Sequence, residues 1–168
     1  SDGGASVEPT REDIDLPKAQ ALLLSGRYQE ALGALDQDFS AAEADPLDLW
    51  VLRFAVSILA GPEVIPPQAD TSLSVALIDR LLSLAALMGG QEELDILHAA
   101  YREFSNHGYA DRLLYRLAVR YEAPGPERDI EASVRFYRLI LNEFPLSPFW
   151  DTAEGRKNYL ERHFLLVR

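Results

Sequence analysis

Histidines, paired carboxylates and glycine-rich turns are the places where this 168-residue chain could carry out chemistry. Its three histidines are His98, His107 and His163, and no two of them are four residues apart, as zinc ligands on one helical face would be. The chain contains no cysteine, which excludes thiolate metal ligands and disulfides. It also lacks the Gly-x-Ser-x-Gly turn of serine hydrolases and a glycine-rich phosphate loop. We therefore expect no catalytic residues, no cofactor and no metal.

Arginines form the clearest charged feature of the chain. Arg112, Arg116 and Arg120 follow one another at i, i+4 and i+8, so they would lie on one face of a helix. Arg128, Arg135 and Arg138 continue the row along the chain. In a chain with a formal net charge of −11, this basic C-terminal half could bind an acidic segment or a chain terminus of a partner. The alternative is pairing within the chain. The carboxylates nearest in the sequence are Asp111, Glu122, Glu127 and Glu131.

The acidic balance of the chain bears on its partners as well. With 27 acidic and 16 basic side chains, the surface would repel phosphate backbones, so we expect no nucleic-acid partner. No uncharged apolar run approaches the roughly 20 residues that span a bilayer. Contact with a membrane would therefore require an anchor outside this sequence.

The segments that position these side chains have helical periodicity throughout. Apolar residues recur at spacings of three and four, and alternating strand patterns are absent. Loops marked by glycine or proline separate the segments. The pattern predicts an all-α fold of about eight antiparallel helices. Their expected ranges are 14–25, 28–42, 47–60, 73–88, 91–105, 110–122, 130–143 and 148–166.

The first eleven residues differ in composition from the rest of the chain. Residues 1–11 are small, polar and aperiodic, so they cannot bury apolar surface, and we expect a disordered tether there. Residues 12–168 should form a single helical domain that contains an irregular, Pro-rich loop at 61–70.

A helix-pair signature recurs along this domain. Its first copy is Ala19-x6-Ser25-Gly26-Arg27-Tyr28-x-Glu30-Ala31-Leu32, closed by Asp45-Pro46. Its last copy is Leu114-x2-Leu117-Ala118-x2-Tyr121, continued by Glu131-Ala132-x3-Phe136 and closed by Phe144-Pro145. Ala85 and Ala118 are 33 residues apart, close to the length of one tetratricopeptide (TPR) repeat. Across most of residues 12–166 the chain resembles the TPR superfamily.

The resemblance implies a short right-handed solenoid in which helix pairs stack on their neighbours. The middle repeat departs from the pattern, because the loop 61–70 stands where the helix at 47–60 should have a partner. Either the second repeat has lost one helix, or the helix at 47–60 packs across the stack as an insertion. A plain α-bundle is the alternative to a repeat fold.

The C-terminal third resembles a narrower group. The run Phe136-Tyr137-x2-Ile140-Leu141-x2-Phe144-Pro145-x-Ser147-Pro148-Phe149, followed by Ala153 and Arg156, is similar to repeats of bacterial outer-membrane TPR lipoproteins of the BamD type. Those proteins have Tyr-Pro-x-Ser-x-Tyr at this junction, and both tyrosines are phenylalanines here. The resemblance implies a periplasmic scaffold, lipid-anchored to the outer membrane, with the residues at the N-terminus as its tether. A cloning remnant at the N-terminus and a cytoplasmic location are the alternatives.

In TPR arrays the first helix of each pair lines the concave face, so the resemblance implies a partner-binding surface there. The residues that the pattern places on it are Gln20, Leu23, Leu24, Arg112, Tyr115, Arg116, Val119, Arg120 and Glu122. We expect a non-catalytic scaffold of the bacterial cell envelope that binds a protein or peptide on this face.

A small-molecule or lipid carrier is the alternative function, with the loop 61–70 covering an apolar cavity between helices. A closed cavity would favour the carrier, and an open concave face would favour the scaffold. A homo-oligomer is a further expectation, because a solenoid without a polar terminal cap leaves an apolar edge. The residues that could supply this edge are Leu160, Phe164, Leu165 and Leu166.

Overall fold

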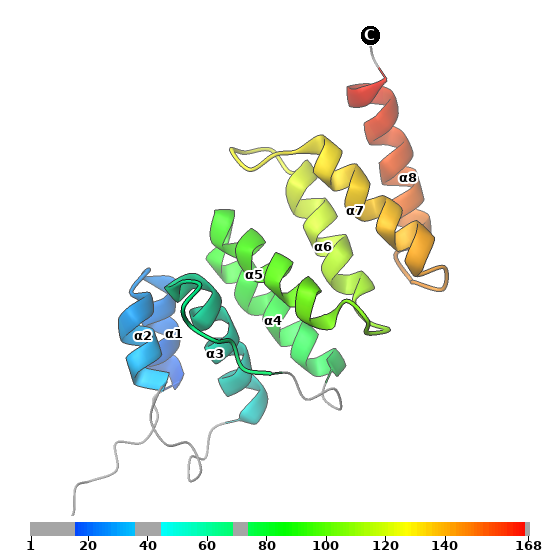
Figure 1. Ribbon diagram of the computed structural model, residues 1–168. Coiled ribbons are helices and arrows are strands. Elements are labelled where there is room, and N and C mark those ends of the chain that lie inside the picture. Colours follow the sequence, from blue (N-terminus) through cyan, green and yellow to red (C-terminus); the bar gives the residue numbers. More distant parts are fainter. Residues whose placement is uncertain (1–15, 36–44, 69–73, 167–168) are drawn as a thin grey trace, which may run out of the picture.

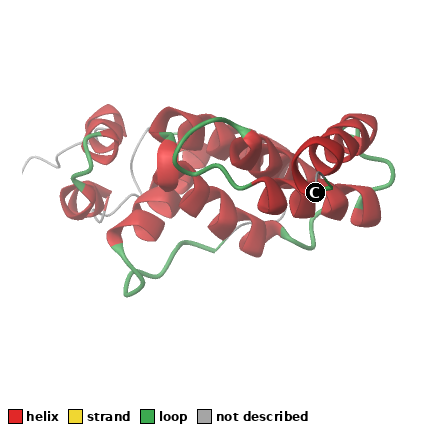
Figure 2. Cartoon of the chain, turned by 90° about the horizontal axis from the view of Figure 1, so that it is seen from above, coloured by secondary structure: helices red, strands yellow, loops and turns green. Residues whose placement is uncertain are grey.

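The computed structural model describes residues 16–35, 45–68 and 74–166. Within these ranges the chain is helical and contains no strand (Figures 1 and 2), which confirms the all-α prediction. The expected tether at 1–11 and the last two residues of the loop 61–70 lie outside the described residues. The elements are α1 (Leu16–Leu24), α2 (Tyr28–Leu35), α3 (Pro46–Ala60), α4 (Ser74–Met88), α5 (Gly90–Phe104), α6 (Asp111–Glu122), α7 (Ile130–Glu143), α8 (Trp150–Leu160) and the π-helical turn η2 (Glu161–Leu165).

Local sequence signals set several helix ends. The Asp45 carboxylate accepts a hydrogen bond from the Leu47 N–H at 2.9 Å, and Pro46 occupies the first turn, where its missing N–H costs nothing. Asp129 caps α7 in the same way, accepting from the Ala132 N–H at 2.9 Å. Gly89 has φ 65°, a conformation that glycine adopts readily, so the chain can end α4 and begin α5 without a loop.

The helices stack in chain order. Each helix packs on the next one, and further contacts join α1 to α3, α3 to α5 and α4 to α6. Figure 1 shows the resulting run from α1 and α2 at lower left to α8 at upper right. Contacts confined to neighbours and next neighbours define a helical repeat stack.

The position of α3 explains the irregular middle of the stack. α3 packs on α1, α2, α4 and α5, so it continues the stack. Beside α5, the helices α4 and α6 also pack on each other. Beside α3, the helices α1 and α4 instead face each other across a groove. This arrangement agrees with the loss of one helix from the second repeat.

Two apolar clusters form the core. The larger one runs through α1 to α5 and includes two leucines of α6, and the smaller one joins α6, α7 and α8. Leu23 belongs to the first cluster and has no exposed surface. Tyr137, which is also fully buried, lies at the centre of the second. The Pro-rich loop is held to α3 by a hydrogen bond of 2.9 Å from the Trp50 indole N–H to the Gln68 carbonyl.

Candidate docking groove

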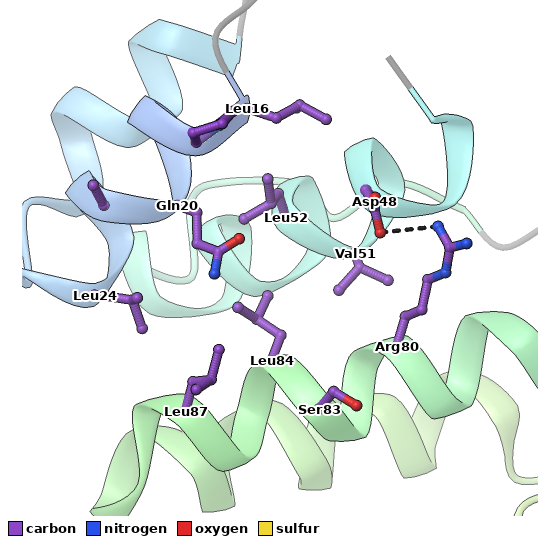
Figure 3. Close-up of a pocket in the computed structure, with 12 residues that line it drawn as sticks. Leu16, Gln20, Leu24, Asp48, Val51, Leu52, Arg80, Ser83, Leu84 and Leu87 are labelled. Atoms are coloured by element: carbon purple, nitrogen blue, oxygen red, sulfur yellow. Dashed lines mark hydrogen bonds and ion pairs between the residues drawn. The ribbon is translucent and has the colours of Figure 1, made fainter.

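An apolar groove of about 650 Å³ separates α1 from α4. Figure 3 shows the α1 side chains on one wall, the α4 side chains on the opposite wall, and Val51 and Leu52 of α3 between them. Apart from a few polar groups, the lining is aliphatic. The side chains that define the two walls are Leu16, Gln20 and Leu24 on α1 and Arg80, Ser83, Leu84 and Leu87 on α4.

Helical spacing brings each wall together. The α1 residues lie at i, i+4 and i+8, and the α4 residues Arg80, Leu84 and Leu87 lie at i, i+4 and i+7, so each set occupies one helical face. At the rim, Leu24 is 44% exposed and Leu87 is 63% exposed. Large aliphatic side chains exposed on both sides of a groove are typical of a surface that another molecule covers.

The groove is charged at one end. Arg80 forms ion pairs with Asp45 at 2.7 Å and with Asp48 at 2.9 Å. The guanidinium, together with the Leu47 N–H, holds the pKa of the Asp45 carboxyl below its usual value. Two carboxylates face one guanidinium, so this end keeps a net negative charge. Figure 3 shows Leu24 and Leu87 at the opposite end.

The predicted residues of α1 divide between groove and core. Gln20 and Leu24 line the groove, as expected for a binding face. Leu23 was expected beside them, but its side chain is fully buried. The reason is geometric: successive helical residues point about 100° apart, so Leu23 turns into the core when Leu24 turns outward.

The arginines of α6 do pair within the chain, but with carboxylates on other helices. Arg112 bonds to Asp79 of α4 at 2.6 Å. Arg116 and Arg120 both form ion pairs with Glu93 of α5, at 2.6 and 2.8 Å, and Arg116 also donates a hydrogen bond to this carboxylate. The Glu93 carboxylate is 1% exposed, whereas its two partners are 35% and 24% exposed. The row therefore joins α6 to the helices before it.

The carboxylates that were expected to pair with this row have other surroundings. Asp111 accepts a hydrogen bond from the Ser147 hydroxyl at 2.6 Å, and Glu122 pairs with Arg156 of α8 at 3.3 Å. For Asp111 and Glu122 the predicted pairing was wrong, because it relied on closeness in the sequence. In a stack, the side chains that face α6 come from neighbouring helices.

The remaining predicted residues of α6 pack between helices. The Tyr115 ring stacks on Phe149, with centroids 4.4 Å apart, and meets the edge of Tyr137 at 6.3 Å. Val119 is partly buried. The α6 residues thus do not contribute to the groove lining, whereas the α1 residues Gln20 and Leu24 do.

His98 is partly buried and contacts two aromatic side chains. Its Nε2 lies 2.6 Å from the Tyr121 hydroxyl, and its ring is 5.6 Å from that of Phe136. Burial, with a smaller effect of Arg102, lowers the pKa of His98. Among the described residues, no cluster of three or more histidines and carboxylates could hold a metal ion.

The chain is similar to bacterial proteins that are themselves uncharacterized. The chain matches no known family profile and no solved structure. Similar proteins include an uncharacterized protein of Treponema pallidum (strain Nichols), 24% identical over 152 residues, a match that covers 79% of this chain and 30% of the relative. Another is an uncharacterized protein of Borreliella burgdorferi, 25% identical over 64 residues, covering 38% of this chain and 18% of the relative. The chain thus spans less than a third of the length of these relatives.

The described helices were also compared with the requirements of a membrane span. Within residues 16–35, 45–68 and 74–166, every helix is too short or too polar to cross a bilayer.

Proposed function

We propose that this domain is a non-catalytic scaffold that binds a protein partner in the groove between α1, α3 and α4. The observation that carries the proposal is the exposed aliphatic rim, in which Leu24 and Leu87 face each other across an apolar floor. Docking would remove both side chains from water, which is the main favourable contribution in most protein association.

A carrier of small molecules or lipids is the second candidate, because a volume of about 650 Å³ lies in the range of ligand pockets. Two features favour the scaffold. Leu24 and Leu87 are exposed, so the groove is open at the end away from Arg80. In addition, the described part of the Pro-rich loop, residues 61–68, contributes no side chain to the lining and does not cover it.

The proposed binding site lies beside α1 and does not include the α6 residues that were expected to bind a partner. A binding role for the α6 residues stays a prediction, but an acidic partner there would compete with Asp79 and Glu93 for guanidinium groups that are already paired. Binding at the exposed leucines of the groove would not require an existing ion pair to be broken.

A location in the bacterial envelope forms part of the same proposal. Its support is the resemblance of residues 136–156 to repeats of BamD-type lipoproteins. The domain would then be a periplasmic scaffold, lipid-anchored to the outer membrane.

Affinity capture from native envelope extract tests the function. The groove variant is Leu24→Lys with Leu87→Lys, and the matched control is Ile65→Lys with Leu146→Lys, which adds the same charge at side chains that are 89% and 95% exposed. We expect a stoichiometric protein on the wild type and the control and its loss from the groove variant. Equal capture by all three would place the partner elsewhere. A co-purifying lipid or small molecule, with no protein, would favour the carrier.

A further inference from the structure

We infer that the occupant of the groove is a basic amphipathic α-helix of a protein partner, which takes the place of the helix missing from the stack beside α3. The inference rests on the proposed function, because it specifies the partner for the same groove. Its support comes from the shape, the lining and the charge of the groove.

The shape follows from the comparison of α3 with α5. On α5, the helices α4 and α6 lie side by side in contact. On α3, the helices α1 and α4 are held apart, and Val51 and Leu52, which are only 3% and 4% exposed, form the floor of the groove between them. One further helix laid on α3 would restore the packing that the rest of the stack has.

The size of the groove suits a short helix. A helix about 10 Å across fills roughly 80 Å³ per ångström of length, so the groove of about 650 Å³ would enclose about 8 Å of a complete helix. A helix that inserts only half its circumference would occupy about twice that length, or roughly three turns. The α1 wall runs from Leu16 to Leu24, which corresponds to about 12 Å. Two to three turns of a partner helix therefore match both estimates.

The lining favours a helix over an extended peptide. A helix satisfies its backbone hydrogen bonds internally, whereas an extended chain needs partners for its N–H and C=O groups. Here the polar side chains away from the charged end are Gln20 and Ser83, which are too few for an extended segment. A helix with aliphatic residues at i, i+4 and i+7 would instead fill the groove with its apolar face.

The charge of the groove selects a basic helix. Asp45 and Asp48 face the single guanidinium of Arg80 at one end, in a chain with a net charge of −11. A Lys or Arg near one terminus of the partner helix would neutralise the excess carboxylate. The segments of this chain that precede α1 and α3, residues 1–15 and 36–44, are rich in acidic side chains and do not fit this requirement.

A peptide selection tests the inference. A random 16-residue peptide library would be selected on the full 168-residue chain, with the variant Leu24→Lys, Leu87→Lys used for counter-selection. We expect enriched peptides that have aliphatic residues at i, i+4 and i+7 and a Lys or Arg at one end. They should become helical on binding, and a central proline should abolish their binding. Circular dichroism of each protein variant serves as the control that the variant is folded.

Three variants specify the expected changes in affinity. The groove variant should bind at least tenfold more weakly, because two aliphatic side chains leave the contact, and the control Ile65→Lys, Leu146→Lys should bind as the wild type does. Asp48→Lys should weaken basic peptides about three- to tenfold and favour peptides with Glu at the same terminus.

Other outcomes would overturn the inference. Groove-dependent peptides that are extended, proline-tolerant or acidic would contradict it and leave the docking function intact. A selection that yields no groove-dependent peptide would contradict it as well, and affinity capture would then decide the docking function separately. A dimer of the chain that the groove variant dissolves would make a second copy the occupant.

Discussion

Glu93 joins α5 to α6, and its removal should measurably destabilise the stack. The carboxylate is 1% exposed and forms ion pairs with Arg116 at 2.6 Å and with Arg120 at 2.8 Å. Breaking a fully buried ion pair costs about 3–5 kcal/mol, because a charge is left without a partner. Here the two arginines are 35% and 24% exposed, so water can partly replace the lost carboxylate. We expect Glu93→Ala to lower the free energy of unfolding by about 2 kcal/mol and Glu93→Gln by about 1 kcal/mol.

Urea unfolding followed by circular dichroism measures this loss. For a domain of this size, 2 kcal/mol corresponds to a decrease in Tm of about 4–8 °C. The matched control is Glu154→Ala, an exposed carboxylate on α8, which should stay within about 0.5 kcal/mol of the wild type. A double-mutant cycle of Glu93→Gln with Arg120→Gln should give a coupling energy of about 1 kcal/mol. If Glu93→Ala were as stable as the control, or the cycle showed no coupling, the ion pairs would contribute nothing to the stack.

Three further predictions concern stability. Burial lowers the pKa of His98 below its ordinary value of 6.5, so the folded state favours the neutral imidazole, and the free energy of unfolding should fall as the pH drops below 6.5. His98→Gln should reduce that slope in urea titrations at several pH values, and an unchanged slope would contradict the assignment. Ser133→Ala removes the buried hydrogen bond of 2.7 Å to the Ala118 carbonyl and should cost about 1 kcal/mol in the same assay; no loss would contradict this. Tyr137→Phe should change the free energy of unfolding by less than about 1 kcal/mol, because the buried hydroxyl makes no well-aligned hydrogen bond among the described residues and interacts only weakly with the Glu122 carboxylate; a larger loss would contradict this.

Much of the fold could be predicted from local signals in the sequence. Asp45-Pro46 and Gly89-Gly90 mark helix ends that the structure reproduces, because caps and positive φ angles depend on a few adjacent residues. The apolar periodicity correctly predicts the helical class.

The groove could be predicted only in part, because it depends on how helices are placed relative to one another. Gln20 and Leu24 were expected on a binding face and line the groove. Arg80, Leu84 and Leu87 were not predicted, because apolar residues surround nearly all of α4 and their pattern does not single out one exposed face. Leu87 is in fact exposed, so the surplus of apolar residues on α4 was the sequence signal that could have indicated an apolar surface on this helix.

The partners of the α6 arginines could not be derived either. Glu93 lies 23 residues before Arg116, a separation at which sequence spacing carries no information about contact. Only the packing of α5 on α6 brings the two side chains together.

Photo-crosslinking in living cells tests the docking groove most directly. A photoreactive amino acid would be placed at Ser83, an exposed residue that lines the groove, and for comparison at Leu146, which is 95% exposed and lies outside it. We predict a discrete protein adduct at Ser83 that is absent at Leu146 and is lost when Leu24→Lys and Leu87→Lys are added. The absence of an adduct at Ser83, or the same adducts at both positions, would contradict the proposal that the groove docks a protein partner.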